Sequence, residues 1–318
     1  MSQDHRKRPV PRFAGIKTFM NLPHSREEEA LPGCDVAVVG LPFDTGASHR
    51  VGARFGPGVI REISALIREY NPFLDLSPTD HLTMLDYGDS PVVPGNTPAS
   101  LELIEDTVAY LAGFGAIPMA MGGDHTVSLP ALRGVARHTG PLALVHFDSH
   151  PDTWDGHFGE KFTHATPFRR AVDEGLILPE RSIQLGIRGS VGDAKDYLMT
   201  REMGFTLVEA HRLLEMSPQE VHSLVSDTVG DSPVYLTFDV DFLDPAFAPG
   251  TGTPEIGGPT SAQTLAYLRG LDYTRLAGCD VVEVLPAYDS GDITSLLAAN
   301  VMFEIMCLVA RARLAAKG

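Results

Sequence analysis

The stretch LALVHFDSHPD, at residues 142–152, decides how this chain is read. Its first six residues form a nearly continuous apolar run, which is typical of a β-strand covered on both faces. The run leads straight into Asp148, His150 and Asp152, which occupy every second position. In an extended segment such side chains project on one face. We therefore expect two carboxylates and an imidazole to converge at the end of a buried strand.

Two further strand ends add ligands of the same kind. The apolar run 234–238 is followed by Asp239 and Asp241, and the run 117–121 is followed by GGDH, which places His125 at the sheet edge. Such a cluster is costly to bury unless a positive charge neutralises it, and a divalent metal ion does so directly. Taken alone, each motif has an interpretation without a metal. The aspartates could belong to a solvated acidic turn, and His125 could be a hydrogen-bonded histidine of the core.

Two imidazoles and four carboxylates are too many for one catalytic zinc, which usually has three protein ligands. They suit two ions roughly 3.5–4 Å apart, bridged by carboxylate and hydroxide. Oxygen and imidazole ligands without thiolate favour Mn²⁺, although other divalent first-row metals would fit.

Strand-like and helix-like segments alternate along the chain. This rhythm predicts an α/β fold in which helices cover both sides of a parallel sheet. Such sheets bind ligands beyond the carboxyl ends of their strands. The predicted strands span 34–41, 82–85, 117–121, 142–147, 182–187, 205–208, 234–238 and 279–285; the predicted helices span 57–70, 100–114, 129–138, 167–174, 218–229, 261–271 and 294–316.

Composition narrows the class of protein. The 318 residues carry a formal net charge of −16, which disfavours binding to nucleic acid. No uninterrupted apolar run reaches the roughly 18 to 20 residues of a membrane helix, and the basic stretch 5–8 has no apolar segment behind it, so we expect neither a membrane span nor a secretory signal. Three widely spaced cysteines indicate no disulfide framework, so we expect a reducing, cytoplasmic location.

Longer motifs resemble one family. The segments GGDHT (122–126), VHFDSHPD (145–152) and TFDVDFLDPAFAPGTGTPE (237–255) are similar to the three signature stretches of the ureohydrolases, the arginase and agmatinase family. The likeness continues through 158–176, 184–190 and 280–289. The long second and third stretches look more like the agmatinase branch than arginase proper. The resemblance implies a three-layer α/β/α arginase-like fold with a mainly parallel eight-stranded sheet, a single catalytic domain over 31–318 and an N-terminal extension over 1–30.

The resemblance also implies roles for individual residues. The six ligands would hold two Mn²⁺ ions, and Asp152 would orient the hydroxide that they generate. His164 would transfer a proton, and Glu283, inside the apolar run VVEVL, would pair with the substrate guanidinium. Independently of the resemblance, we expect the loop 153–163 to line the entrance, with Trp154, His157, Lys161 and Phe162 as its candidate residues. Trp154 and His164 would contact the substrate.

Two positions depart from the family pattern. Ser149 stands where alanine is common, and we expect its side chain to point away from the ligands. Ala165 stands where glycine usually follows the loop histidine, which affects the loop geometry.

These inferences predict hydrolysis of a guanidino compound, with agmatine giving putrescine and urea, a reaction of polyamine biosynthesis. The main alternative is a guanidino acid, guanidinobutyrate or guanidinopropionate, whose carboxylate would suit cations such as His49, Arg50, Arg54 or Lys161. The motifs also allow, less readily, a non-catalytic metal-binding paralogue, a single-zinc enzyme of the related deacetylase fold, or a phosphate-binding module around 40–58. The resemblance implies a homo-oligomer, a trimer or a hexamer.

Overall fold

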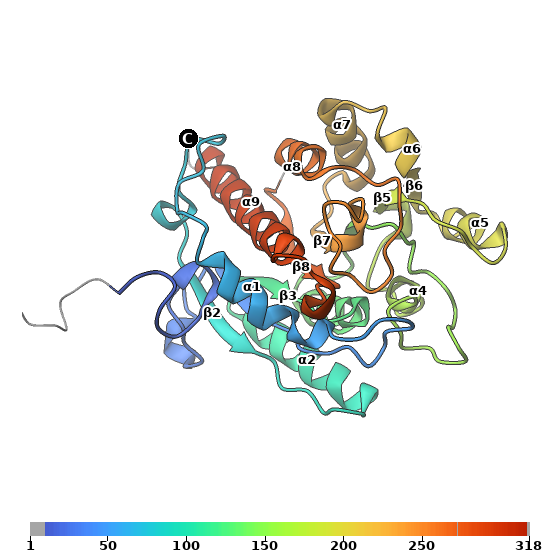
Figure 1. The fold of residues 1–318 in the computed structure, drawn as a ribbon. Coiled ribbons are helices and arrows are strands. Elements are labelled where there is room, and N and C mark those ends of the chain that lie inside the picture. Colours follow the sequence, from blue (N-terminus) through green and yellow to red (C-terminus); the bar gives the residue numbers. More distant parts are fainter. Residues whose placement is uncertain (1–9, 272, 317–318) are drawn as a thin grey trace, which may run out of the picture.

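The computed structural model describes residues 10–271 and 273–316. Within them, eight strands form one sheet in which each pair of neighbours is parallel (Figure 1). The order across the sheet is β2-β1-β3-β8-β7-β4-β5-β6. The eight predicted strands and the parallel sheet are confirmed. The strands are Val36–Gly40 (β1), Met84–Asp89 (β2), Ile117–Met121 (β3), Ala143–Phe147 (β4), Ile183–Ile187 (β5), Thr206–Glu209 (β6), Val234–Asp239 (β7) and Leu276–Val282 (β8).

Helices connect the strands, and the seven predicted ones are present. Helix α1 ends six residues earlier than predicted. Its last N–H groups turn to the i−3 carbonyls, and Asn71, which precedes a proline, pairs with Leu76 instead. The short polar helices α5 and α6 were not predicted, because they carry no clear apolar face. The helices are Gly56–Ser64 (α1), Thr97–Gly113 (α2), Ser128–Thr139 (α3), Pro167–Asp173 (α4), Lys195–Glu202 (α5), Ala210–Leu213 (α6), Pro218–Val229 (α7), Ser261–Gly270 (α8) and Ile293–Ala315 (α9).

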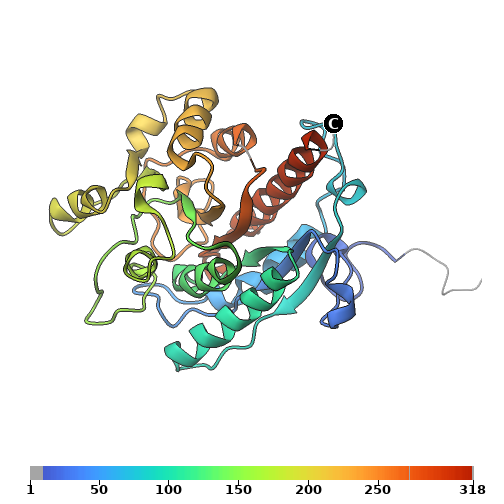
Figure 2. The same ribbon diagram turned by 180° about the vertical axis from the view of Figure 1, so that it is seen from behind.

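Successive side chains along each strand point to opposite faces of the sheet, so the buried side chains form two cores, one on each face. In β1, Val36 and Val38 pack into one core with residues of α7, α8 and α9. Ala37 and Val39 face the other core, which contains residues of α2, α3 and α4. Figures 1 and 2 show these helices on opposite sides of the sheet. The fold is therefore the predicted three-layer α/β/α arrangement.

Helix α9 lies in the first core. By length and composition it could cross a membrane, but 83% of its apolar window is buried inside the protein. Counting uninterrupted apolar runs overlooked this helix, because Asn300 and Glu304 break the run. Glu304 pairs with Arg269 of α8. Among the described residues, then, the one helix of this kind is a core helix.

The N-terminal part of the described chain is attached to this core. Phe19 and Met20 are buried, and the Phe19 backbone N–H donates to Asp86 Oδ2. The basic stretch 5–8 lies outside the described residues. The division into an extension over 1–30 and a domain over 31–318 stays a prediction.

Strand β8 ends three residues earlier than predicted, and this places Glu283. The backbone of Glu283 has a φ of 64°, in the left-handed region that a non-glycine residue rarely adopts. A residue in that conformation cannot continue a strand. Glu283 therefore lies just beyond the strand, at the sheet edge, and not within it as the apolar run VVEVL indicated.

Candidate metal centre and active site

The side chains predicted as metal ligands lie together at the carboxyl ends of three strands. His125 opens the short 3₁₀ helix His125–Val127 after β3, and Asp241 lies in a similar turn, Val240–Phe242, after β7. Strand β8 lies between β3 and β7, and β4 follows β7 in the sheet. The sheet order thus brings together residues far apart in the chain: His125, Asp148, His150, Asp152, Asp239 and Asp241.

One group of ligands surrounds the His125 ring. Its Nδ1 atom lies 3.0 Å from Asp148 Oδ2, 3.0 Å from Asp152 Oδ2 and 3.4 Å from Asp239 Oδ2. Burial by itself lowers the pKa of His125, yet these carboxylates raise it well above its ordinary value. The atom is buried and has no aligned hydrogen-bond partner among the described residues. Three carboxylate oxygens and one imidazole nitrogen therefore converge on one point.

A second group surrounds His150. Its Nδ1 atom lies 3.1 Å from Asp241 Oδ2 and 3.5 Å from Asp148 Oδ1. The two oxygens of Asp148 thus face different histidines, Oδ2 toward His125 and Oδ1 toward His150. A carboxylate in that position joins the two groups in the way that a ligand bridging two ions would.

The donor set fits divalent cations. Burial raises the pKa of both Asp239 and Asp241, and neighbouring carboxylates raise it further. Asp241 Oδ2 is also buried without an aligned hydrogen-bond partner among the described residues. Buried carboxylates that repel one another, with an unpaired nitrogen and oxygen aimed inward, need a positive charge between them. The oxygen and imidazole donors, with no thiolate, are those of a site for a hard or borderline metal.

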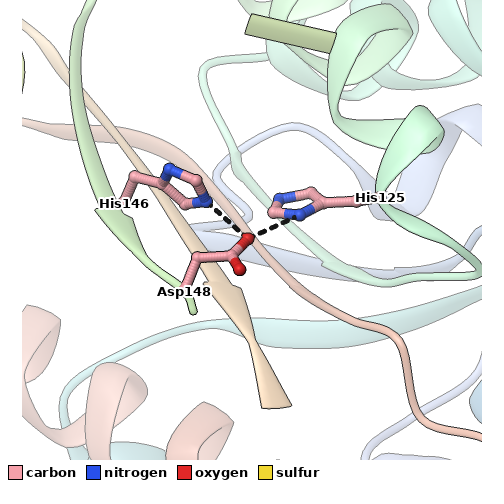
Figure 3. Close-up of side chains that lie close together, drawn as sticks. All are labelled: His125, His146 and Asp148. Carbon is pink, nitrogen blue, oxygen red and sulfur yellow. Dashed lines mark hydrogen bonds and ion pairs between the residues drawn. The ribbon is translucent and has the colours of Figure 1, made fainter. Parts of the chain in front are cut away.

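Sequence reasoning missed His146. This buried residue of β4 places Nε2 2.7 Å from Asp148 Oδ2, the same oxygen that faces His125 (Figure 3). A carboxylate oxygen only accepts, so the imidazole donates and holds Asp148 in place. The Phe168 ring packs 4.5 Å from the His146 ring. The signal was present, because His146 precedes Asp148 by two residues and so shares its face of the strand.

The expectation that Ser149 points away from the ligands is wrong. Its buried hydroxyl donates to Asp241 Oδ1 at 2.7 Å, and its backbone N–H reaches the same oxygen at 3.1 Å. The hydroxyl also lies 3.0 Å from His150 Nδ1. Strand β4 ends at Phe147, so the alternation that governs a strand no longer applies at Ser149.

Asp124 and Asp244 follow the same strand ends but contact backbone. Asp124 accepts from the N–H groups of Gly46 and Thr126. Burial and the nearby Glu283 raise its pKa to about 7. Asp244 accepts from the N–H groups of Ala246 and Gly257. Both carboxylates therefore hold loops around the centre.

His164 and Glu283 are in contact. His164 Nδ1 lies 3.2 Å from Glu283 Oε1, and His164 Nε2 lies 2.7 Å from the Ser48 hydroxyl. The same Oε1 accepts the backbone N–H of His125 at 3.0 Å. Burial lowers the pKa of His164, but the bond to Glu283 outweighs it and raises the value to about 9. The contact with the buried carboxylate therefore favours a proton on His164 Nδ1, which can donate to Glu283 Oε1.

A cavity of about 340 Å³ opens above the centre. Of the predicted entrance residues, Trp154 and His157 line it, whereas His49, Arg50, Arg54 and Lys161 do not. Arg54 pairs with Asp44, and Arg50 lies over the Tyr288 ring. Among the described residues that line the cavity, none is lysine or arginine: they are Ser48, His150, Asp152, Trp154, His157, His164, Ala165, Ser190, Val191, Gly192, Asp196, Asp239 and Thr253.

Comparison with known proteins agrees with this architecture. The arginase family profile matches residues 34–308. Guanidinopropionase of Pseudomonas aeruginosa is 45% identical over 98% of this chain and 98% of its own length. The mitochondrial agmatinase of Gallus gallus is 44% identical over 94% of this chain and 87% of its own.

A solved structure, proclavaminate amidino hydrolase from Streptomyces clavuligerus, superposes with a TM-score of 0.89 at 40% identity, covering 95% of this chain and all of the other. The chain belongs to the arginase family, the ureohydrolases.

Proposed function

We propose that this chain hydrolyses the guanidino group of a small linear substrate to urea and an amine, at a centre of two Mn²⁺ ions. The observation that carries the proposal is the pair of imidazole–carboxylate groups that share Asp148 at the floor of a cavity, beside Glu283. Family membership and the names of relatives such as guanidinopropionase and agmatinase support the same chemistry.

The ligands divide between the two ions. His125, Asp148, Asp152 and Asp239 would hold one, and His150, Asp148 and Asp241 the other. Bound by these residues, two divalent ions would lower the pKa of a shared water toward neutrality and so supply a hydroxide nucleophile. Asp152, with its backbone φ of 50°, holds its carboxylate against the His125 group. It is placed to orient the nucleophile by accepting a hydrogen bond.

Glu283 and His164 act on the substrate. Glu283 is buried directly behind His164, which lines the cavity. Its carboxylate would bind a guanidinium through paired N–H donors and fix its orientation, which lowers the entropic part of the barrier. The substrate guanidinium and His164 compete for this carboxylate, so His164 is released as the substrate binds. While it pairs with Glu283, the pKa of His164 is raised to about 9, which favours a proton on the ring. Once the guanidinium takes its place at Glu283, that cause is lost and His164 gives up the proton more readily. It can therefore donate that proton to the leaving amine. Trp154 supplies one wall of the cavity.

The cavity lining favours a substrate with a cationic tail, and we propose agmatine, which would give putrescine and place the enzyme in polyamine biosynthesis. The Asp196 carboxylate lies in the lining, and the described lining contains no lysine or arginine to meet a carboxylate tail. The second candidate is a guanidino acid, since a relative at 45% identity is named guanidinopropionase. For that substrate the tail would depend on His157 and the Ser190 hydroxyl.

The experiment is urea release from agmatine, guanidinobutyrate, guanidinopropionate and arginine, measured side by side with the Mn²⁺-loaded protein. We expect release from at least one of the first three, with the highest rate for agmatine. His150→Ala or Asp239→Ala should abolish this release. His211→Ala, an exposed position on α6, is the matched control and should keep full activity. If metal is bound but no guanidino compound yields urea, the chain is a non-catalytic paralogue and the proposal fails.

We further propose a cytoplasmic homo-oligomer, a trimer or a hexamer, that binds neither nucleic acid nor membrane. The three cysteines are buried and free, which supports a reducing compartment. Light scattering coupled to gel filtration measures the subunit number directly, and a monomer would overturn this part.

A further inference from the structure

A buried carboxylate lies behind the metal centre and contacts none of the proposed metal ligands. Asp280, on β8, is fully buried, and no ion pair among the described residues involves it. Three hydroxyl groups meet it instead: Thr237 Oγ1 at 2.5 Å from Oδ1, and Ser128 Oγ and Tyr235 OH each at 2.7 Å from Oδ2. A buried charge is expensive, so this dedicated set of donors requires an explanation.

Sheet register places Asp280 where it can act on the centre. Thr237 of β7 and Asp280 of β8 are direct partners across the two parallel strands. Thr237 stands two residues before Asp239, one of the proposed ligands. Its hydroxyl lies 2.9 Å from Nε2 of His125, which comes from β3 on the far side of β8. A chain of hydrogen bonds therefore runs from Asp280 through Thr237 to the back of the His125 ring.

The direction of this chain follows from counting protons. A carboxylate only accepts, and a hydroxyl has one proton to give. Because Thr237 gives its proton to Asp280, it can only accept from His125, and Nε2 must carry the proton of the imidazole. In the neutral imidazole, the form that binds a metal, the Nδ1 lone pair is then free on the side where Asp148, Asp152 and Asp239 converge. A metal-binding histidine needs this arrangement, with one nitrogen as the ligand and the other held as a donor.

We propose that Asp280 is a positioning residue that acts through Thr237 to fix the tautomer and orientation of His125, and so sets the metal affinity of the His125 side of the centre. The inference rests on the proposed metal centre. Ser128 and Tyr235 donate to the other oxygen of Asp280, Oδ2, so Oδ1 stays available to accept from Thr237. This series of hydrogen bonds therefore affects the binding of the ion on the His125 side and not that of the ion on the His150 side.

The test is Mn²⁺ binding, measured by competition with a chelating dye and by metal content per chain. Thr237→Val keeps the shape of the side chain but removes the hydroxyl. We expect it to lose about 10- to 100-fold in affinity for one of two ions, while the second ion binds as in the unchanged protein. Thr237→Ser restores the hydroxyl and should stay within about threefold of the unchanged protein.

Two further variants separate positioning from general damage to the core. Thr264→Val removes a similarly buried hydroxyl from α8, far from the centre, and should leave both affinities unchanged. Asp280→Asn should weaken one ion when made alone but add little in the Thr237→Val background, because both act on one chain. Full metal binding by Thr237→Val, or equal losses for Asp280→Asn in both backgrounds, would overturn the inference. Absence of Mn²⁺ binding by the unchanged protein would instead overturn the proposed function.

Discussion

The contact between His164 and Glu283 gives a prediction whose size can be worked out from the structure. Burial lowers the pKa of His164 and the bond to Glu283 raises it, with a net rise from 6.5 to about 9. One pKa unit corresponds to 1.36 kcal/mol, so in the metal-free protein the protonated form of His164 gains roughly 3 kcal/mol. Glu283→Gln removes the charge and leaves the burial, so the pKa of His164 should fall below 6.5.

The sign of the effect on stability follows from linkage. A histidine with a raised pKa in the folded state stabilises the protein fully below pH 6.5, and that stabilisation is lost as pH rises through about 9. The quantity to compare is the unfolding free energy of the unchanged protein minus that of Glu283→Gln, measured at the same pH. This difference should be about 3 kcal/mol larger at pH 6 than at pH 9.5. Asp124, whose pKa is raised to about 7 by burial and by Glu283, adds to the difference in the same direction.

Two measurements on metal-free protein check this prediction. Urea denaturation at pH 6 and pH 9.5 gives the difference in unfolding free energy. Imidazole NMR titration gives the midpoint of His164 directly, assigned among the 12 histidines by a His164→Asn variant. Glu255→Gln is the control, because that carboxylate faces His150 and does not contact His164. A His164 midpoint near 6.5 in the unchanged protein, or one still near 9 in Glu283→Gln, would refute the reasoning.

Three further substitutions probe the support of the centre. Ser149→Ala removes the hydroxyl that donates to Asp241 Oδ1 and should weaken Mn²⁺ binding on the His150 side severalfold, as measured by dye competition. An unchanged affinity would contradict this prediction. Phe168→Ala leaves a cavity against the His146 ring and should lower the unfolding free energy by about 3–5 kcal/mol in urea denaturation; a loss below about 1 kcal/mol would count against this packing. The Arg188 guanidinium donates to the backbone carbonyls of Asp241, Phe242, Leu243 and Glu255. Arg188→Lys cannot make these bonds together, so the unfolding free energy should fall by about 2 kcal/mol or more and kcat should fall as well. A fully active and equally stable variant would argue against this role.

Local sequence rules describe the strands of this protein but fail where the strands end. Short apolar runs located the strands well, because most of them are covered on both faces. Alternation of side chains along a strand is the second local rule. It should also have found His146, which shares a strand face with Asp148. The rule failed at Ser149, because the chain leaves the extended conformation after Phe147 and the side chain turns toward Asp241.

The loops were less predictable than the strands. Glu283 lies in a left-handed conformation that an apolar run cannot reveal. The cations Arg50, Arg54 and Lys161 were plausible entrance residues, but they are not among the described residues that line the cavity. Whether a loop side chain reaches a cavity depends on contacts with distant segments, such as that between Arg50 and the Tyr288 ring, and not on local spacing.

The sequence by itself determined the inventory of the centre: two imidazoles and four carboxylates, each placed where a buried strand ends. That much is local, because the strand period and the end of an apolar run depend on neighbouring residues. Only the tertiary structure decided that β8 lies between β3 and β7, which brings Glu283 to the centre and places Asp280 behind His125. Strand order is set by packing between segments that are separate in the sequence, and no pattern within one segment contains it. In the β3–β8 pair, for example, Met119 lies opposite Cys279, 160 positions further along.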